Sequence, residues 1–491
     1  MDPIFSVPEL TSLIFDHLNK PALISCALVC KSWNELALDK LWKELDSLVP
    51  LISLLTPLKK SEDDSSMLEF TRPIRAWGIF DRYARRVRSL DLDDELSTLS
   101  ASIFYEIALK RLSPVLLPNL SRLKIMVDGY YLDMLSYSLL FTEKNIEEFA
   151  LVLPYPYSNC GPFQELIPDF FEECAIRMPR LRIFELYSIY SHWPVATIEN
   201  HVALFLSSLP KLVNFKCSVH FTTPCIANAL SRLPSLRSIE FKTEGDIGSG
   251  LQSDVMVFEP LIAFTDAFHA LSVFEVSATF DDMRKLLEKD FALGLDKLFI
   301  HSPQLESAES LHQCLCALPK QRPWLRSLHL DSVNEADEPL MNDYGQEIDC
   351  VTLETLEHVL DFPRLIDFLE VLWLCIDPVL DQRPILTPAV LPMLARRCPR
   401  LRHLALYLNT HFDDPWLPSQ DTVESVRFIS LEEIKFGTSP ITDEDISEFA
   451  FYLSRVLPQT CSIGSLCGVY WLRRQDLEDL GHCIEPEFLK R

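Results

Sequence analysis

The sequence predicts a chain of the α/β class, in which a small all-α N-terminal domain precedes a repeat solenoid with a parallel β-sheet on its concave side and helices on its convex side. Three observations support this prediction. Residues 7–45 hold three short amphipathic segments, a leucine-rich phrase recurs between residues 87 and 436, and the length of 491 residues exceeds one ordinary globular core.

The N-terminal segments have the apolar spacing of short helices. Pro8 and Pro21 each stand where a helix can begin, since the missing N–H of proline would be unpaired there anyway. Aliphatic side chains recur on one face of the first segment: Leu10, Leu13, Ile14 and Leu18. So short a piece cannot bury all of its apolar surface alone, and we expect part of that surface to face a partner or the rest of the chain.

The order of residues in this segment is distinctive. It reads Val7-Pro8-Glu9-Leu10, then Ile14-Phe15, then Ala27-Leu28-Val29-Cys30-Lys31-Ser32-Trp33, and closes with Leu41-Trp42. The segment resembles an F-box, whose usual first leucine is Val7 here. A generic helical cap on a larger domain is the alternative, and it would have to match both the Pro-Glu-Leu opening and the Val-Cys-Lys-x-Trp block by chance.

The resemblance to an F-box implies docking onto a Skp-family adaptor, which links to a cullin and a RING subunit. Carried over residue by residue, it implies that these side chains contact the adaptor or support the contact: Pro8, Leu10, Ile14, Leu18, Val29, Cys30 and Trp33. For Ile14 and Trp33, a place in the interface and a place in a three-helix core remain equally open. The two roles can coexist in so small a domain.

The rest of the chain repeats the phrase Leu-x-x-Leu-x-Leu with substitutions, often after a proline such as Pro118, Pro179 or Pro399. Its copies span residues 87–92, 120–125, 181–186, 212–217, 236–241, 271–276, 295–300, 325–330, 369–374, 401–406 and 431–436, with a weaker copy at 146–151. The final Leu-x-Leu alternates as a strand with its leucines toward the core, and the earlier leucine packs the turn before it. Intervening segments such as Thr197 to Leu209 have helical spacing.

This pattern resembles a degenerate leucine-rich-repeat solenoid of the kind seen in fungal F-box proteins. An ordinary α/β domain with parallel strands is the alternative, but leucines at fixed offsets favour the solenoid. We expect an F-box domain at 1–45, a helical connector with a polar loop at 46–80, about 11–12 irregular repeats at 81–460 and a C-terminal cap at 461–491. Loops are expected at 244–257 and 332–350.

The inner face of the predicted sheet is the expected substrate-binding surface. Its strand positions include Asp91, Lys124, Glu185, Lys216, Glu240 and Lys435. The candidate substrate-binding residues are Tyr187, His220, His329, Trp373 and Tyr407. The aromatic Trp373, Tyr187 and Tyr407 are the stronger candidates, because exposed aromatic side chains often anchor interfaces. A merely solvated strand face is the alternative for each of these positions.

The amino-acid composition limits the classes of partner that the chain can bind. The net charge of −26, from 71 acidic and 45 basic residues, opposes binding to nucleic acid or to an anionic membrane. The 14 cysteines are scattered, and the start Met1-Asp2-Pro3 lacks the basic and apolar character of a secretory leader. We therefore expect a cytosolic or nuclear protein with reduced thiols. No phosphate-binding loop, nucleophile motif or zinc-type spacing is found, so no cofactor, metal or catalytic residue is expected.

These observations combine into one leading hypothesis. The chain is expected to be the non-catalytic substrate receptor of a Skp–cullin–F-box ubiquitin ligase, with the F-box on the adaptor and the repeats on a protein substrate. A non-catalytic scaffold without a ligase role is the alternative, and an enzyme is a distant third.

Overall fold

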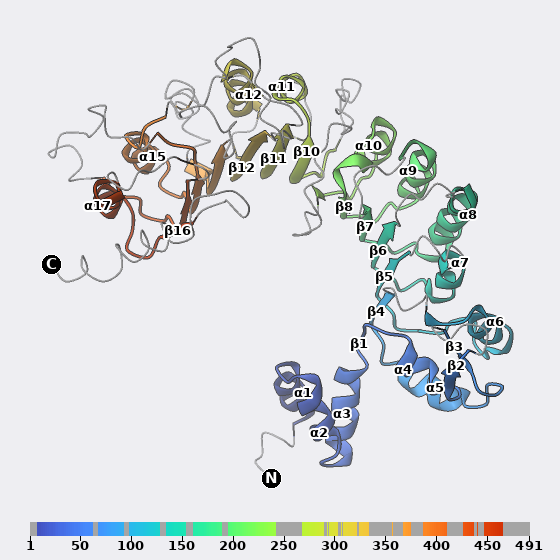
Figure 1. The fold of residues 1–491 in the computed structure, drawn as a ribbon. Helices are drawn as coiled ribbons and strands as arrows, with labels where there is room; N and C mark the ends of the chain where they lie inside the picture. The colour runs from blue at the N-terminus through green and yellow to red at the C-terminus, as the bar shows by residue number, and fades with distance from the viewer. Residues whose placement is uncertain are drawn as a thin grey trace. The chain divides into compact units, whose positions relative to one another are not determined.

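The computed structural model describes residues 7–61, 67–92, 98–127, 134–153, 161–188, 195–241, 268–288, 292, 294–302, 306, 308–321, 324–332, 356, 367–374, 386–409, 426–436, 439 and 446–464. These residues form two compact units. The first contains residues 1–221 and 228–235, and the second contains residues 222–227 and 236–491. Figure 1 shows helices and parallel strands alternating along the chain in both units.

Three helices open the first unit: α1 (Pro8–Asp16), α2 (Lys20–Ala27) and α3 (Lys31–Leu41). The side chain of Asn19 caps α2, since its Oδ1 accepts the backbone N–H of Ala22 at 3.0 Å. An ion pair between Lys40 and Asp16 joins α3 to α1. The core between the helices consists of Phe15, Leu23 and Ala37, with partly buried apolar side chains around it.

The first unit continues with strands and helices in alternation. Its parallel strands lie in the order β1 (Glu44–Leu45), β4 (Ser89–Leu92), β5 (Arg122–Met126), β6 (Glu148–Leu153), β7 (Ile183–Ser188) and β8 (Asn214–Cys217). A separate antiparallel pair consists of β2 (Leu58–Lys60) and β3 (Leu68–Phe70). The helical segments are α4 (Val49–Ile52), α5 (Trp77–Ala84), α6 (Ala101–Lys110), α7 (Met134–Ser138), η3 (Leu139–Phe141), α8 (Gly161–Arg177), η4 (Val195–Thr197), α9 (Glu199–Ser207) and η5 (Val219–Phe221).

The second unit repeats the same arrangement. Its parallel strands lie in chain order: β9 (Ser238–Phe241), β10 (Val273–Ser277), β11 (Lys297–Ser302), β12 (Ser327–Ser332), β13 (Val371–Leu374), β14 (His403–Ala405), β15 (Glu433–Lys435) and β16 (Ser462–Gly464). Its helices include α11 (Phe280–Leu287), α12 (Ala308–Gln321), α15 (Val390–Arg397) and α17 (Ile446–Val456). The helix α10 (Pro224–Ser231) holds residues of both units.

The proline that precedes many copies of the phrase shapes a tight turn. Leu120 donates its N–H to the carbonyl of Leu117 at 3.1 Å, and Pro118 occupies the position after the acceptor. The same bond recurs from Leu181 to Met178 and, across other prolines, in later repeats. Proline suits the second position of such a turn because its φ is already fixed near the required value. The turn delivers each following leucine into the core, where Leu120 and Leu181 are fully buried.

One backbone contact repeats between successive strands. The carbonyl of Arg88 accepts the N–H groups of both Ser121 and Arg122, at 2.9 and 3.0 Å. The carbonyl of Ser121 does the same for two consecutive residues of the next repeat. The same pair of bonds is accepted by further carbonyls, those of Lys43, Glu147, Arg182, Arg237, Ser272, Asp296, Arg326, Glu370 and Arg402. Because each pair of bonds allows only one alignment, the leucines of neighbouring strands stay in register.

The predicted fold class is confirmed: a helical N-terminal domain precedes parallel strands that alternate with helices. The predicted connector is only partly helical, because β2 and β3 pair between α4 and α5. The short strands β1 and β16 were not predicted, since neither carries the Leu-x-Leu alternation. The predicted loops 244–257 and 332–350, apart from Ser332, and most of the predicted cap lie outside the described residues.

Replacing Leu123 with alanine tests how strongly a registered leucine supports the first unit. Leu123 is fully buried in β5, so we expect a loss of about 2–5 kcal/mol in unfolding free energy from lost burial and a residual cavity. Urea unfolding followed by circular dichroism measures the change. The same replacement at Leu109, which is 84% exposed on α6, is the matched control and should stay within about 0.5 kcal/mol. Equal effects at the two positions would contradict this account of the core.

Candidate functional site

The N-terminal domain leaves a large part of its aliphatic side chains outside its core. Leu28 is 83% exposed, and Leu13, Ile24 and Val29 are each more than half exposed. Leu10 and Ile14 of α1 are exposed as well. We call these six side chains of α1, α2 and the α2–α3 link the aliphatic face. So many exposed aliphatic side chains on two short helices and the link after them are typical of a surface that is covered by a partner.

The predicted adaptor residues divide between this face and the core. Pro8, Leu10, Ile14 and Val29 are exposed. Leu18 and Trp33 instead pack against the core, where the Trp33 ring meets Phe15 edge to face at 5.5 Å. Three further members of the aliphatic face, Leu13, Ile24 and Leu28, are more than half exposed and were not among the predicted contacts. The sequence signal for them was the 3–4-residue spacing of apolar positions, which does not separate core from surface in so short a helix.

Cys30 lies beside the aliphatic face at the N-terminal end of α3. It is the residue that precedes the first turn, and its Sγ lies 3.2 Å from the hydroxyl of Ser32. The hydrogen bond of Ser32, followed by the backbone N–H of Trp33, lowers the pKa of the Cys30 thiol. Both donors stabilise the thiolate. Cys30 therefore adds a polar side chain next to the otherwise aliphatic face.

A second group of contacts joins the helical domain to the strands that follow. The guanidinium of Arg86 donates to the carboxylates of Glu35 and Asp39 on α3, and to the carbonyl of Glu35 at 3.1 Å. Burial opposes the charge on this guanidinium, yet the bonds to Glu35 and Asp39 raise the pKa of Arg86. The ring of Trp42 lies 4.6 Å from that of Tyr83 on α5. Thus α3 faces the body of the first unit, while the aliphatic side chains lie on α1, α2 and the α2–α3 link.

The second unit presents a row of aromatic side chains on its sheet. Phe299, His329 and Trp373 occupy registered positions on β11, β12 and β13. Their rings contact in sequence, at 5.8 Å between Phe299 and His329 and 4.7 Å between His329 and Trp373. The Nζ of Lys435 on β15 lies 4.8 Å from the centre of the Trp373 ring. The lysine side chain reaches across the intervening strand β14, where the residue in register with Trp373 and Lys435 is the small Ala405.

His301, two residues after Phe299 on β11, joins this row and links it to β10. Its ring lies 5.4 Å from His329, and its Nε2 lies 2.9 Å from Oε1 of Glu275 on β10. The other oxygen of Glu275 accepts the backbone N–H of Phe241 at 2.7 Å. We call Phe299, His301, His329, Trp373 and Lys435 the aromatic strip. Edge-to-face ring contacts, a cation–π contact and an anchored histidine hold its side chains in place before any partner binds.

The other predicted substrate residues are less favourably placed. Tyr187 was expected to be exposed, but only 7% of it is, and it pairs in register with buried Val152. His220 lies in η5 after β8, with its ring 4.4 Å from that of Phe221. Tyr407 is half-buried and follows β14. The structure thus brings His329 and Trp373 together in one strip, and it places Tyr187, His220 and Tyr407 elsewhere.

Among the described residues, no three His, Cys, Asp or Glu side chains are grouped as metal ligands. In the same part of the chain, no helix is both long and apolar enough to span a membrane.

Comparison with known families supports the interpretation of the N-terminal domain. The model of F-box-like domains matches residues 8–47, which include α1, α2, α3 and all of β1. The chain therefore carries an F-box-like domain in front of an array of parallel strands and helices.

Comparison with whole proteins adds little. No curated protein matches the chain. A chain of the Rad7 and Elc1 complex in yeast is 15% identical with a TM-score of 0.39, covering 82% of this chain and 88% of that one. A protein from Bacteroides fragilis is 13% identical with a TM-score of 0.28, covering 84% and 89%. Both TM-scores are below 0.5, so neither likeness supports an argument about function.

Replacing Arg86 with alanine tests the attachment of the F-box-like domain. Glu35 and Asp39 would lose their shared cation, so we expect faster amide hydrogen exchange in α3 and β1, equivalent to about 1–3 kcal/mol of local stability. Arg82→Ala is the matched control, because Arg82 is exposed on the neighbouring helix α5. Unchanged exchange in α3 after Arg86→Ala would show that the ion pairs do not hold the domain.

Proposed function

We propose that this chain is the substrate receptor of a Skp–cullin–F-box ubiquitin ligase. The observation that carries the proposal is the aliphatic face, which an F-box-like domain of 40 residues leaves exposed. A Skp-family adaptor covers this face and connects the chain to a cullin and a RING subunit. In this role the chain catalyses no covalent step, and we place it in the cytosol or nucleus, where ubiquitin ligases meet their substrates.

The contribution of such a receptor is positional. A substrate held on the receptor experiences a high effective concentration of the charged conjugating enzyme, and its lysines react faster for that reason alone. A loosely tethered adaptor-binding domain would dilute this effect. The contacts of Arg86, Trp42 and β1 support the proposal, because they fix the F-box-like domain against the strands of its own unit.

The aromatic strip is the surface that we assign to the substrate. Aromatic side chains bury a large area at small entropic cost, and they dominate the binding energy of many protein interfaces. In the strip, Trp373 is already oriented by His329 on one side and by Lys435 on the other. A partner that packs on these rings would therefore lose little side-chain freedom.

A scaffold role without ubiquitin transfer is the second candidate. It uses the same two surfaces and differs only in whether the adaptor brings a cullin with it. Co-purification of the full chain with adaptor, cullin and RING subunits supports the ligase role. An adaptor complex that never contains a cullin, together with unchanged levels of the bound protein after loss of this chain, would support the scaffold.

Charge introduced into the aliphatic face should abolish adaptor binding. We expect Leu28→Glu combined with Val29→Glu to weaken the complex with a recombinant Skp-family adaptor by about 30-fold or more, because buried charges would remain unpaired. Isothermal titration calorimetry measures this loss. Folding should be unaffected, since both side chains are exposed.

The control for this variant is Leu109→Glu, which introduces a charge at an exposed leucine of α6. It should leave adaptor affinity unchanged. Equal affinity of the wild type and the Leu28/Val29 variant would exclude the aliphatic face as the adaptor surface.

Removal of the Trp373 ring should uncouple the substrate from an intact ligase. In cells that express the full chain, we expect Trp373→Ala to retain adaptor and cullin but to reduce the ubiquitin-modified proteins that depend on this receptor. Quantitative mass spectrometry of ubiquitin remnants measures them. Trp324→Ala is the matched control, because Trp324 is exposed and packs on Phe368 instead of the strip. If the two tryptophan variants behave alike, the strip does not bind the substrate.

A further inference from the structure

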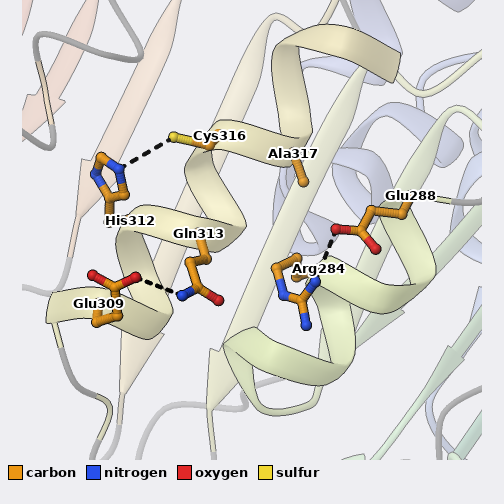
Figure 2. Close-up of a pocket in the computed structure, with 7 residues that line it drawn as sticks. All are labelled: Arg284, Glu288, Glu309, His312, Gln313, Cys316 and Ala317. Atoms are coloured by element: carbon orange, nitrogen blue, oxygen red, sulfur yellow. Dashed lines mark hydrogen bonds and ion pairs between the residues drawn. The ribbon is translucent and has the colours of Figure 1, made fainter.

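A groove on the helical side of the second unit is not used by the proposed function. It lies between α11 and α12 and has a volume of about 450 Å³. Its lining residues are Arg284, Glu288, Glu309, His312, Gln313, Cys316 and Ala317. Figure 2 shows that all seven come from these two neighbouring helices, with His312 and Cys316 on successive turns of α12.

The groove contains a thiol and an imidazole in contact. The Sγ of Cys316 lies 3.5 Å from Nε2 of His312, within the range of a hydrogen bond to sulfur. The spacing of four residues places both side chains on one flank of α12, because its core face is occupied by Leu311, Leu315 and Leu318. Cys314, two residues before Cys316, is completely buried. Thus the same helix carries one sheltered thiol and one that lines a groove.

We propose that Cys316 is a modification site that reacts with small neutral or cationic disulfides. In this reaction, Nε2 of His312 takes the thiol proton while Sγ of Cys316 attacks one sulfur of the disulfide. The new S–S bond forms as the old one breaks. The departing thiolate then takes the proton from the imidazolium and leaves as a thiol. The products are a mixed disulfide on Cys316 and one free thiol, with the disulfide as the only oxidant.

The charge of the groove sets the preference among disulfides. Glu288 and Glu309 bring two carboxylates into the lining, against the single guanidinium of Arg284. That guanidinium is already bonded to Glu288 and to Asp281, each at 2.8 Å. Glu309 is exposed and bonds a neutral partner, the amide of Gln313. An anionic disulfide is therefore repelled, and a cationic one is attracted.

The first experiment measures the rates at individual cysteines of the folded full-length chain. The reagents are cystamine, bis(2-hydroxyethyl) disulfide and oxidised glutathione, and peptide mass spectrometry reads each site. We expect Cys316 to react faster than the half-buried Cys225, and Cys314 not to react. We also expect cystamine to be preferred over oxidised glutathione at Cys316, and Glu309→Gln to reduce that preference. A rate at Cys316 no higher than at Cys225, or a preference unaffected by Glu309→Gln, would overturn the proposal.

The second experiment tests the contribution of His312. We expect His312→Asn to slow Cys316 at pH 7 by roughly threefold or more, because a neighbouring base raises the thiolate fraction by more than it lowers nucleophilicity. The pH midpoint of the reaction should rise as well. Cys30 is the internal control, since its thiolate is stabilised by Ser32 and Trp33 and should keep its rate.

Loss of structure is read within the same measurement. If His312→Asn makes Cys314 reactive, the variant has opened α12. The role of His312 is then tested by His312→Gln and by the pH profile of the wild-type chain. A wild-type midpoint for Cys316 equal to that of Cys225 would overturn the role of His312.

Discussion

The paired backbone hydrogen bond between successive strands is the constraint on which the rest of the structure depends. One carbonyl, such as that of Arg88 or Asp296, accepts N–H groups from two consecutive residues of the next strand segment. These bonds fix the alignment of neighbouring strands, and side chains alternate between the two faces of a strand. A slip of one residue would therefore expose buried leucines such as Leu123 and Leu328 and would bury the charged and aromatic side chains opposite them.

The F-box-like domain is attached through the same contact. Lys43 supplies the first carbonyl of the series, which accepts the N–H groups of Arg88 and Ser89 at 2.8 and 3.0 Å. The chain thus leaves α3 directly into β1, and Arg86 binds the two acidic side chains of α3 nearby. Because α3 is committed to the strands, the apolar side chains left over lie on α1, on α2 and just after α2. The adaptor-binding surface that we propose is a consequence of this attachment.

The regular parts of the fold could be predicted because they depend on local patterns. Leu-x-Leu alternation places strands such as β5 and β12, and a proline after a buried residue places the turns that precede them. Contacts between distant residues leave no such pattern. The basic residues near Arg86 gave no sign that this one would bind Glu35 and Asp39, about 50 positions earlier in the sequence. Likewise, β1 has only two residues, too few to show an alternation.

The aromatic strip could be predicted from the sequence only in part. His329 and Trp373 were predictable because they occupy the same position in two copies of one phrase. The contact of Trp373 with Lys435 depends instead on a residue with no functional group: Ala405 is small enough for the lysine to reach across β14 to the ring of Trp373. A larger side chain at that register position would separate the two. The order of the strip therefore comes from register, which sequence patterns predict, and from side-chain volume at one intervening strand, which becomes meaningful only once the strands are aligned.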